Sequence, residues 1–268
     1  MSTAVAPGAT AAPPRPARRR GLRAALVLAL VVAAADGFLL WGRTLATPVG
    51  AEQAAASFLK APPATELPGP RPPAGVYSYR TSGYERVDRF GIDRAYPAET
   101  VRVISWRGGC RWRETVPIFT QHVETYDFCA AGTDAEDFAS ETSLTYFLVP
   151  GVQRFGCAPT GRRLLTGHPP GTSRTWRCVQ GTSVSANTTI YIGPDTVQTT
   201  TGPVATRHLR LITALSGQST GGAVRDLWLA ADGLVVKEDR RVALKVRSAF
   251  VGLLSYDEEA SFLLTRRP

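Results

Sequence analysis

The pattern of apolar and polar positions divides the chain into three parts. Residues 24–41 (AALVLALVVAAADGFLLW) are almost continuously apolar and follow an arginine-rich stretch. Residues 49–60 (VGAEQAAASFLK) have the composition of a short helix. From residue 75 onward, runs rich in Val, Ile, Thr, Tyr, Phe and Trp recur between Gly, Pro, Asn and Asp. This last pattern predicts strands rather than helices.

The strand-like runs are regularly spaced over the C-terminal three quarters of the chain. They fall at 75–80, 100–107, 111–116, 122–130, 143–149, 174–179, 183–192, 204–215, 223–229, 234–246 and 254–265. Asp232-Gly233 and Gly108-Gly109 mark turns, since Gly and Asp tolerate the positive φ that tight hairpins need. Because no helical pattern separates the runs, we predict a mainly β fold with one antiparallel domain at 75–268.

The apolar run at 24–41 is long enough to be a transmembrane helix. At about 1.5 Å rise per residue it spans roughly 27 Å, close to the ~30 Å hydrocarbon core. The basic residues lie mainly on its N-terminal side, at Arg15, Arg18, Arg19, Arg20 and Arg23, with Arg43 alone following closely. The positive-inside rule therefore predicts a single-pass membrane protein with a cytoplasmic N-terminus and an extracytoplasmic C-terminal domain.

A cleaved signal peptide is the alternative interpretation of the same run. Residues 33–35 are three small alanines before Asp36, so cleavage after Ala35 would give a secreted protein. Apolar character resumes at 38–41, which favours the uncleaved signal anchor. The segment contains no cysteine and hence no lipid-attachment motif.

The segments that flank the predicted anchor have simple compositions. Residues 1–23 are expected to form a disordered cytoplasmic tail. Residues 42–74 are expected to contain a juxtamembrane helix and a linker. Six prolines occur within 61–75, which favours an extended, semi-rigid spacer that holds the β domain away from the bilayer.

The net charge of +9 does not indicate a nucleic-acid partner. Residues 1–43 contain six Arg and one Asp, while the rest of the chain has 25 basic and 21 acidic residues. Much of the positive charge is therefore the topology signal, and no basic block with interleaved aromatic residues follows it.

Four cysteines lie in the predicted extracytoplasmic domain, where disulfides persist. Three pairings are possible. In an antiparallel hairpin, the numbers of paired residues have a constant sum. Cys110 and Cys129 centre on the 119–121 turn, and Cys157 and Cys178 centre on the 167–170 turn. We therefore predict the pairs Cys110–Cys129 and Cys157–Cys178.

Residues that could carry chemistry are scattered. His122, His168 and His208 show no ligand spacing, and no nucleophile elbow, phosphate loop or HExxH motif is present. The acidic groups at 134–137 and 257–259 could bind a cation, but they lack the spacing of a cation-binding loop, which favours solvated strand ends. Trp106, Trp112, Trp176 and Trp228 fall at strand positions, which favours a place in the core over a ligand cage. We predict no catalytic residue, no cofactor and no metal site.

Two stretches carry a resemblance to known proteins: GVYSYRTSGYE at 75–85, and DLWLAADGLVVKEDR at 226–240 followed by GLLSYDEEASFLLT at 252–265. With the two cysteine hairpins, they resemble an uncharacterised family of actinobacterial membrane-anchored or secreted proteins. The 226–240 pattern is also similar to the mycobacterial LppX/LprG and LolA-type lipoproteins. That similarity implies an antiparallel half-barrel around an apolar cavity for lipid.

The membrane anchor and the strand pattern together favour a non-enzymatic binding module for an apolar or lipid ligand of the cell envelope. A structural or protein-interaction module of the envelope is the second hypothesis. An envelope hydrolase is the third, and the missing motifs make it the weakest. The expected partners are thus the membrane, through the N-terminal helix, and a lipid or envelope protein.

Overall fold

The computed structural model describes residues 30, 32, 46–60, 71–88, 91–132, 134–146, 149–163, 167–248 and 252–268. The chain divides into two units, Met1–Trp41 and Gly42–Pro268. The predicted tail and anchor lie outside the described residues, except for Leu30 and Val32, which are helical. Within the described ranges, no helix has both the length and the apolar character needed to span a bilayer.

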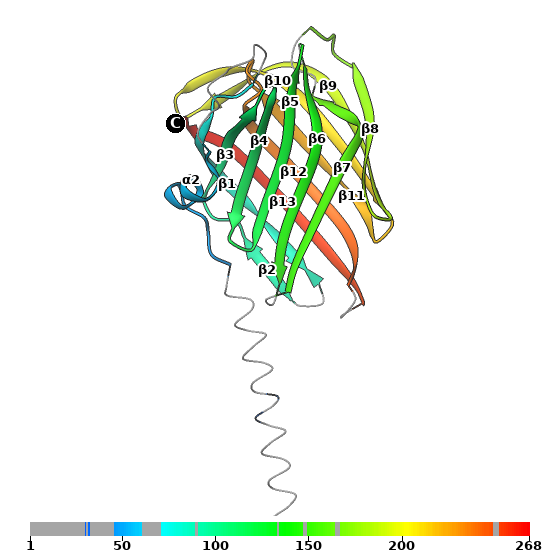
Figure 1. The fold of residues 1–268 in the computed structure, drawn as a ribbon. Coiled ribbons are helices and arrows are strands. Elements are labelled where there is room, and N and C mark those ends of the chain that lie inside the picture. Colours follow the sequence, from blue (N-terminus) through cyan, green and yellow to red (C-terminus); the bar gives the residue numbers. More distant parts are fainter. Residues whose placement is uncertain are drawn as a thin grey trace, which may run out of the picture. The chain divides into compact units, whose positions relative to one another are not determined.

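The second unit is a closed antiparallel β-barrel (Figure 1). In the described part of the chain, twelve strands form its wall: β1 (Gly75–Val87), β3 (Glu99–Gly108), β4 (Arg111–Phe119), β5 (His122–Ala131), β6 (Asp134–Tyr146), β7 (Val149–Arg163), β8 (Ser173–Gln180), β9 (Ser183–Thr199), β10 (Gly202–Ser216), β11 (Ser219–Leu229), β12 (Val235–Ser248) and β13 (Gly252–Arg266). The short β2 (Ile92–Ala95) pairs with the end of β1. Consecutive wall strands are neighbours, so local hairpins build most of the barrel.

Pairing of β1 with β13 closes the barrel, with Gly83 opposite Ala260 and Val87 opposite Tyr256. The mainly β prediction is confirmed, but the predicted open half-barrel is wrong. Closure joins segments from opposite ends of the domain. Because this closure depends on no turn or local sequence pattern, it cannot be predicted from residues that are neighbours in the chain.

The barrel has two distinct ends (Figure 1). We call the lower end the one that carries the β1–β2, β4–β5, β6–β7, β8–β9, β10–β11 and β12–β13 turns. The upper end carries the start of β1, the β3–β4 turn and the C-terminus. At the upper end, the predicted Gly108-Gly109 and Asp232-Gly233 turns are confirmed, with φ of 91° at Gly108 and 86° at Gly233.

Most predicted strands fall inside observed ones, but the segment 143–149 does not. It runs from the end of β6 to the first residue of β7 and so contains a turn between two strands. The polar sequence of β6 and the Pro and Gly residues of β7 hide both strands from a composition-based prediction.

The helix α2 (Ala51–Phe58) lies within the segment predicted as helical. It packs against the outer face of β1 and β3, where Ala54 is fully buried beside Val101 and Val103. Before the helix, Thr47 accepts a hydrogen bond from the backbone N–H of Thr120 at the β4–β5 turn (2.8 Å). We call residues 46–60 the strap.

Residues 71–74 are also held on the barrel, near its upper end. The Arg71 guanidinium stacks on Trp106 at 4.4 Å and donates to the carbonyl of Gly109. The Trp106 indole donates to the carbonyl of Pro72. Because the strap docks as well, the chain is fixed on both sides of residues 61–70. Residues 61–70 lie outside the described residues, and the spacer role expected of them stays a prediction.

Candidate functional site

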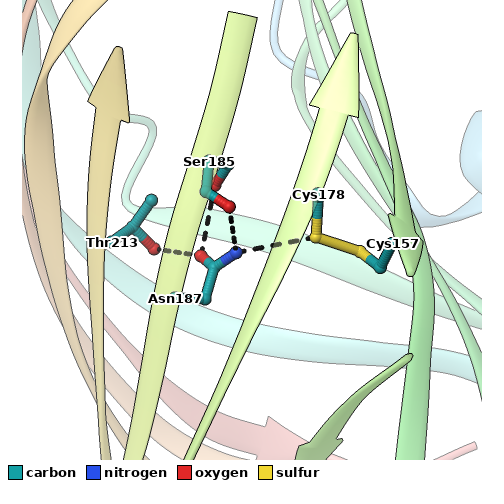
Figure 2. Close-up of a disulfide and its surroundings, with 5 residues drawn as sticks. All are labelled: Cys157, Cys178, Ser185, Asn187 and Thr213. Carbon is teal, nitrogen blue, oxygen red and sulfur yellow. Dashed lines mark hydrogen bonds between the residues drawn. A yellow bond between two sulfur atoms is a disulfide. The ribbon is translucent and has the colours of Figure 1, made fainter. Parts of the chain in front are cut away.

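Both predicted disulfides are present in the predicted pairing, Cys110–Cys129 and Cys157–Cys178. The second bridge joins β7 to β8 and faces the barrel interior (Figure 2). There, Asn187 donates to Cys178 Sγ at 3.5 Å and accepts from Thr213 Oγ1 at 2.8 Å. Disulfides indicate an oxidising, extracytoplasmic compartment for the barrel.

The three histidines lie far apart, and each contacts a carboxylate. His168 Nε2 is 2.8 Å from Asp134, and His208 Nε2 is 2.8 Å from Asp226. His208 also stacks on Trp228 on the outer surface. His122 alone lies deep in the barrel interior.

The other candidates from the sequence are dispersed as well. Trp112 and Trp176 are buried in apolar clusters, whereas Trp106 and Trp228 are half-buried at the periphery. Glu258 faces the interior, while its neighbours Asp257 and Glu259 are exposed. Across the described ranges, no group of three or more His, Cys, Asp or Glu is arranged to hold a metal ion.

The most unusual feature of the interior is a buried network of charged side chains that the sequence analysis did not anticipate. Arg102 on β3 lies between two carboxylates, Glu114 of β4 and Glu238 of β12, with 2.7 Å to Glu238. Glu238 also accepts from Nε of Arg225 on β11 at 2.8 Å. These four side chains are almost completely shielded from solvent. They connect strands that lie on the two sides of the β1–β13 seam.

A second part of the network is centred on Arg240. Its guanidinium contacts Glu124 on β5 (2.6 Å) and Glu258 on β13 (2.5 Å). The Tyr96 hydroxyl donates to Glu258 and accepts from Arg240. Each carboxylate in this part of the interior therefore has a cationic partner.

His122 links the network to β1. Its Nδ1 lies 2.7 Å from Glu85, and its Nε2 lies 3.4 Å from Glu124. Arg94 of β2 donates to the other oxygen of Glu85 at 3.1 Å. Because both ring nitrogens face carboxylates, neither is left to take a proton from a nucleophile.

The network is electrically balanced. Burial would lower the pKa of His122, but hydrogen bonds to Glu124 and Glu85 outweigh burial and raise the pKa to about 10. His122 is therefore cationic at neutral pH. Within the described interior, five cations then face five carboxylates: Arg94, Arg102, His122, Arg225 and Arg240 against Glu85, Glu114, Glu124, Glu238 and Glu258. Such balance is required because an unpaired charge in a protein interior is strongly unfavourable.

The raised pKa of His122 predicts that stability falls with rising pH. The pKa is about 10 in the folded protein against an ordinary value of 6.5. The contribution of protonated His122 to the free energy of unfolding is therefore complete below pH 6.5 and is lost as the pH rises through 10. We expect the free energy of unfolding to fall in this window by up to about 1.4 kcal/mol per pH unit.

Denaturant unfolding at successive pH values checks this. His122→Gln should remove most of the slope, whereas the control His208→Gln on the outer surface should retain it. A wild-type stability that stays constant from pH 6.5 to 10 would contradict the assignment.

On the acid side, burial would raise the pKa of Glu238, but Arg225 and Arg102 lower it to about 2. The contribution of ionised Glu238 to stability is present above the ordinary pKa of 4.5 and is lost as the pH falls towards 2.

The lower end of the interior has a different character. Cross-strand partners share one face of a sheet, so Leu144 faces inward with its partner His122, and Leu244 with its partner Tyr256. The same register places a set of apolar side chains inside that are only half-buried: Leu144, Leu211, Leu215, Val242, Leu244 and Leu254. We call this set the lower apolar lining. It gives the barrel an apolar inner surface that solvent partly reaches.

The comparisons with known proteins add little. No protein-family model matches the chain, and no curated protein matches it. Among solved structures, the hypothetical lipoprotein YmcC from Escherichia coli matches with a TM-score of 0.32 and 10% identity, over 72% of this chain and 85% of that one. A likeness this distant carries no argument about fold or function. Membership in an actinobacterial family and similarity to the LppX/LprG and LolA-type lipoproteins stay predictions.

Proposed function

We propose that the protein is a non-enzymatic, membrane-anchored binding barrel that takes an apolar acyl chain at its lower end. The observation that carries this proposal is the lower apolar lining, because inward leucine and valine side chains that remain half-exposed gain stability when a ligand covers them. The charged network borders this lining directly, with His122 opposite Leu144 and Glu258 opposite Val242, and an apolar cluster fills much of the rest of the interior. The ligand therefore enters from the lower end and does not pass through the barrel.

The remaining hypotheses have less support. The paired nitrogens of His122 and the compensated carboxylates suit a structural role for the network better than acid–base chemistry, which argues against a hydrolase. A protein-interaction module would use free sheet edges. Pairing of β1 with β13 removes two such edges.

Co-purified lipid provides the test. The full-length protein, extracted in detergent and analysed by native mass spectrometry, should carry an acyl lipid. Leu254→Asp places a charge on the inward face of β13 and should reduce the lipid-bound fraction at least about tenfold, which corresponds to about 1.4 kcal/mol. Leu253→Asp is the matched control, because Leu253 is next to Leu254 in the chain but its side chain is 47% exposed on the outer face.

The control should retain the lipid. Equal loss in both variants would show that the leucine lining is not the binding surface. A wild-type protein that carries no lipid would remove the proposal.

A further inference from the structure

Arg225 stands where the charged network meets the lower apolar lining. On the inward face of β11 it pairs with Leu211 of the lining on one side and with Arg240 of the network on the other. Its side chain is only 9% exposed. Because cross-strand partners are in contact, a ligand that covers Leu211 lies next to Arg225.

The Arg225 guanidinium has a donor group to spare. Its Nε donates to Glu238 at 2.8 Å, and its central carbon lies over the Tyr126 ring of β5, 4.8 Å from the ring centroid. Among the described residues, no acceptor lies within hydrogen-bond distance of Nη2, although this atom is shielded from solvent. A buried N–H group without an acceptor is unfavourable and rare in native proteins. Nη2 is therefore suited to an acceptor that a ligand brings into the interior.

Small residues follow Arg225 along β11 towards the lower end. The next two inward positions are Ala223 and Gly221, and solvent reaches both. Their cross-strand partners on β10 and β12 are larger and mostly apolar: Thr213, Leu215, Val242 and Leu244. A linear hydrocarbon chain that lies over Ala223 and Gly221 is therefore flanked by apolar side chains and ends at Arg225.

The charge balance of the network restricts which polar group can bind Nη2. The five cations and five carboxylates of the described interior already compensate one another. A ligand carboxylate would add a sixth buried anion without a cation of its own, which is strongly unfavourable. An ester carbonyl oxygen accepts the same hydrogen bond and adds no charge. The site therefore favours an uncharged acceptor over a free fatty acid.

We infer that Arg225 forms the polar subsite of the barrel, where Nη2 donates to the carbonyl oxygen of an uncharged acyl ester whose hydrocarbon chain lies along β11 over Ala223 and Gly221. This rests on the proposed function and deepens it by naming the class of ligand. The lower apolar lining accepts any apolar chain of suitable length. Arg225 makes the site selective for esters.

Two ligands with the same acyl chain test this selectivity. Delipidated full-length protein in detergent is titrated with methyl palmitate or with palmitate at pH 8, where His122 is cationic, and bound ligand is measured by native mass spectrometry. We expect methyl palmitate to bind at least about tenfold more tightly than palmitate.

Arg225→Lys keeps a cation beside Glu238 but removes the Nη2 group. It should reduce the preference for the ester at least about fivefold. Arg210→Lys is the matched control, because Arg210 also contacts a carboxylate, that of Asp226, but lies on the outer face of β10. Comparing the ratio of the two affinities between proteins in the same detergent cancels the different partition of the two ligands into micelles.

A second pair of variants tests the path of the hydrocarbon chain. Ala223→Leu fills the inward position below Arg225 and should weaken the binding of methyl palmitate at least about tenfold. Val224→Leu, at a side chain that is 40% exposed on the outer face, should leave binding unchanged. Thermal unfolding of each variant verifies that it folds as the wild type does.

Equal or tighter binding of palmitate by the wild type would overturn the inference, and this comparison decides even where Arg225→Lys does not fold. An unchanged preference in folded Arg225→Lys, or unchanged binding in Ala223→Leu, would overturn it as well. Failure of the proposed function looks different. If the two ligands bind the wild type equally and Leu254→Asp loses both, the barrel binds acyl chains but Arg225 is not the polar subsite. If neither ligand binds the wild type, the proposed function falls.

Discussion

Replacing Glu238 by glutamine is expected to lower the free energy of unfolding by about 3–5 kcal/mol. Glu238 is completely buried and contacts both Arg102 and Arg225, with Arg240 at 3.9 Å. Removal of its charge leaves these guanidinium groups facing a neutral amide in a region that water does not reach. The loss therefore reflects the uncompensated cations more than the single lost interaction.

The adjacent residue gives a matched control. Asp239 faces outward, is partly exposed and pairs with Lys237 at 2.7 Å. Asp239→Asn should cost less than about 1 kcal/mol, as exposed ion pairs usually do. Denaturant unfolding followed by tryptophan fluorescence measures both variants. If the two changes proved equally mild, the network would not be the sealed cluster described above.

Gly83→Ala is expected to destabilise the protein by roughly 3 kcal/mol or more, because it acts at the seam that closes the barrel. Gly83 has a φ of 140°, and a Cβ added there would lie 2.2 Å from the carbonyl oxygen of Glu259 and 2.6 Å from Cα of Ala260. Both contacts are with the backbone of β13, which cannot move away without opening the β1–β13 pairing.

Gly202→Ala separates the steric effect from the conformational one. Gly202 also has a positive φ, 115°, but a Cβ there would have no atom within 4 Å. Its substitution should cost only about 1–2 kcal/mol for the backbone conformation. Thermal unfolding of the two variants should differ clearly. Similar melting temperatures would show that the seam tolerates a wider spacing than the structure indicates.

Local signals account for what was predictable from the sequence. The disulfide pairing followed from hairpin symmetry, because β4 with β5 and β7 with β8 are consecutive antiparallel strands. The turns at Gly108 and Gly233 followed from residues that adopt positive φ easily. The mainly β fold followed from composition. Each of these features depends on residues close together in the chain.

The interior network depends on distant residues and was missed. Arg102 meets Glu238 only after the β1–β13 pairing has brought β3 near β12. A sequence-level signal did exist: charged residues alternate in β12, where Glu238 and Arg240 face inward while Asp239 and Arg241 face outward. Without knowledge of the barrel, that run predicts an exposed polar strand. Alternation that places charge on both faces is compatible with burial only where the opposite wall offers partners.

The β1–β13 seam also has a consequence for biogenesis. Tyr84 pairs with Glu259, so the outer edge of the first wall strand stays unpaired until the last strand has been made. Until then, the growing barrel presents an unpaired edge at β1 and another at the most recently formed strand. Unpaired edges invite association with other chains. The interval before closure should therefore be the stage at which this protein is most prone to aggregation.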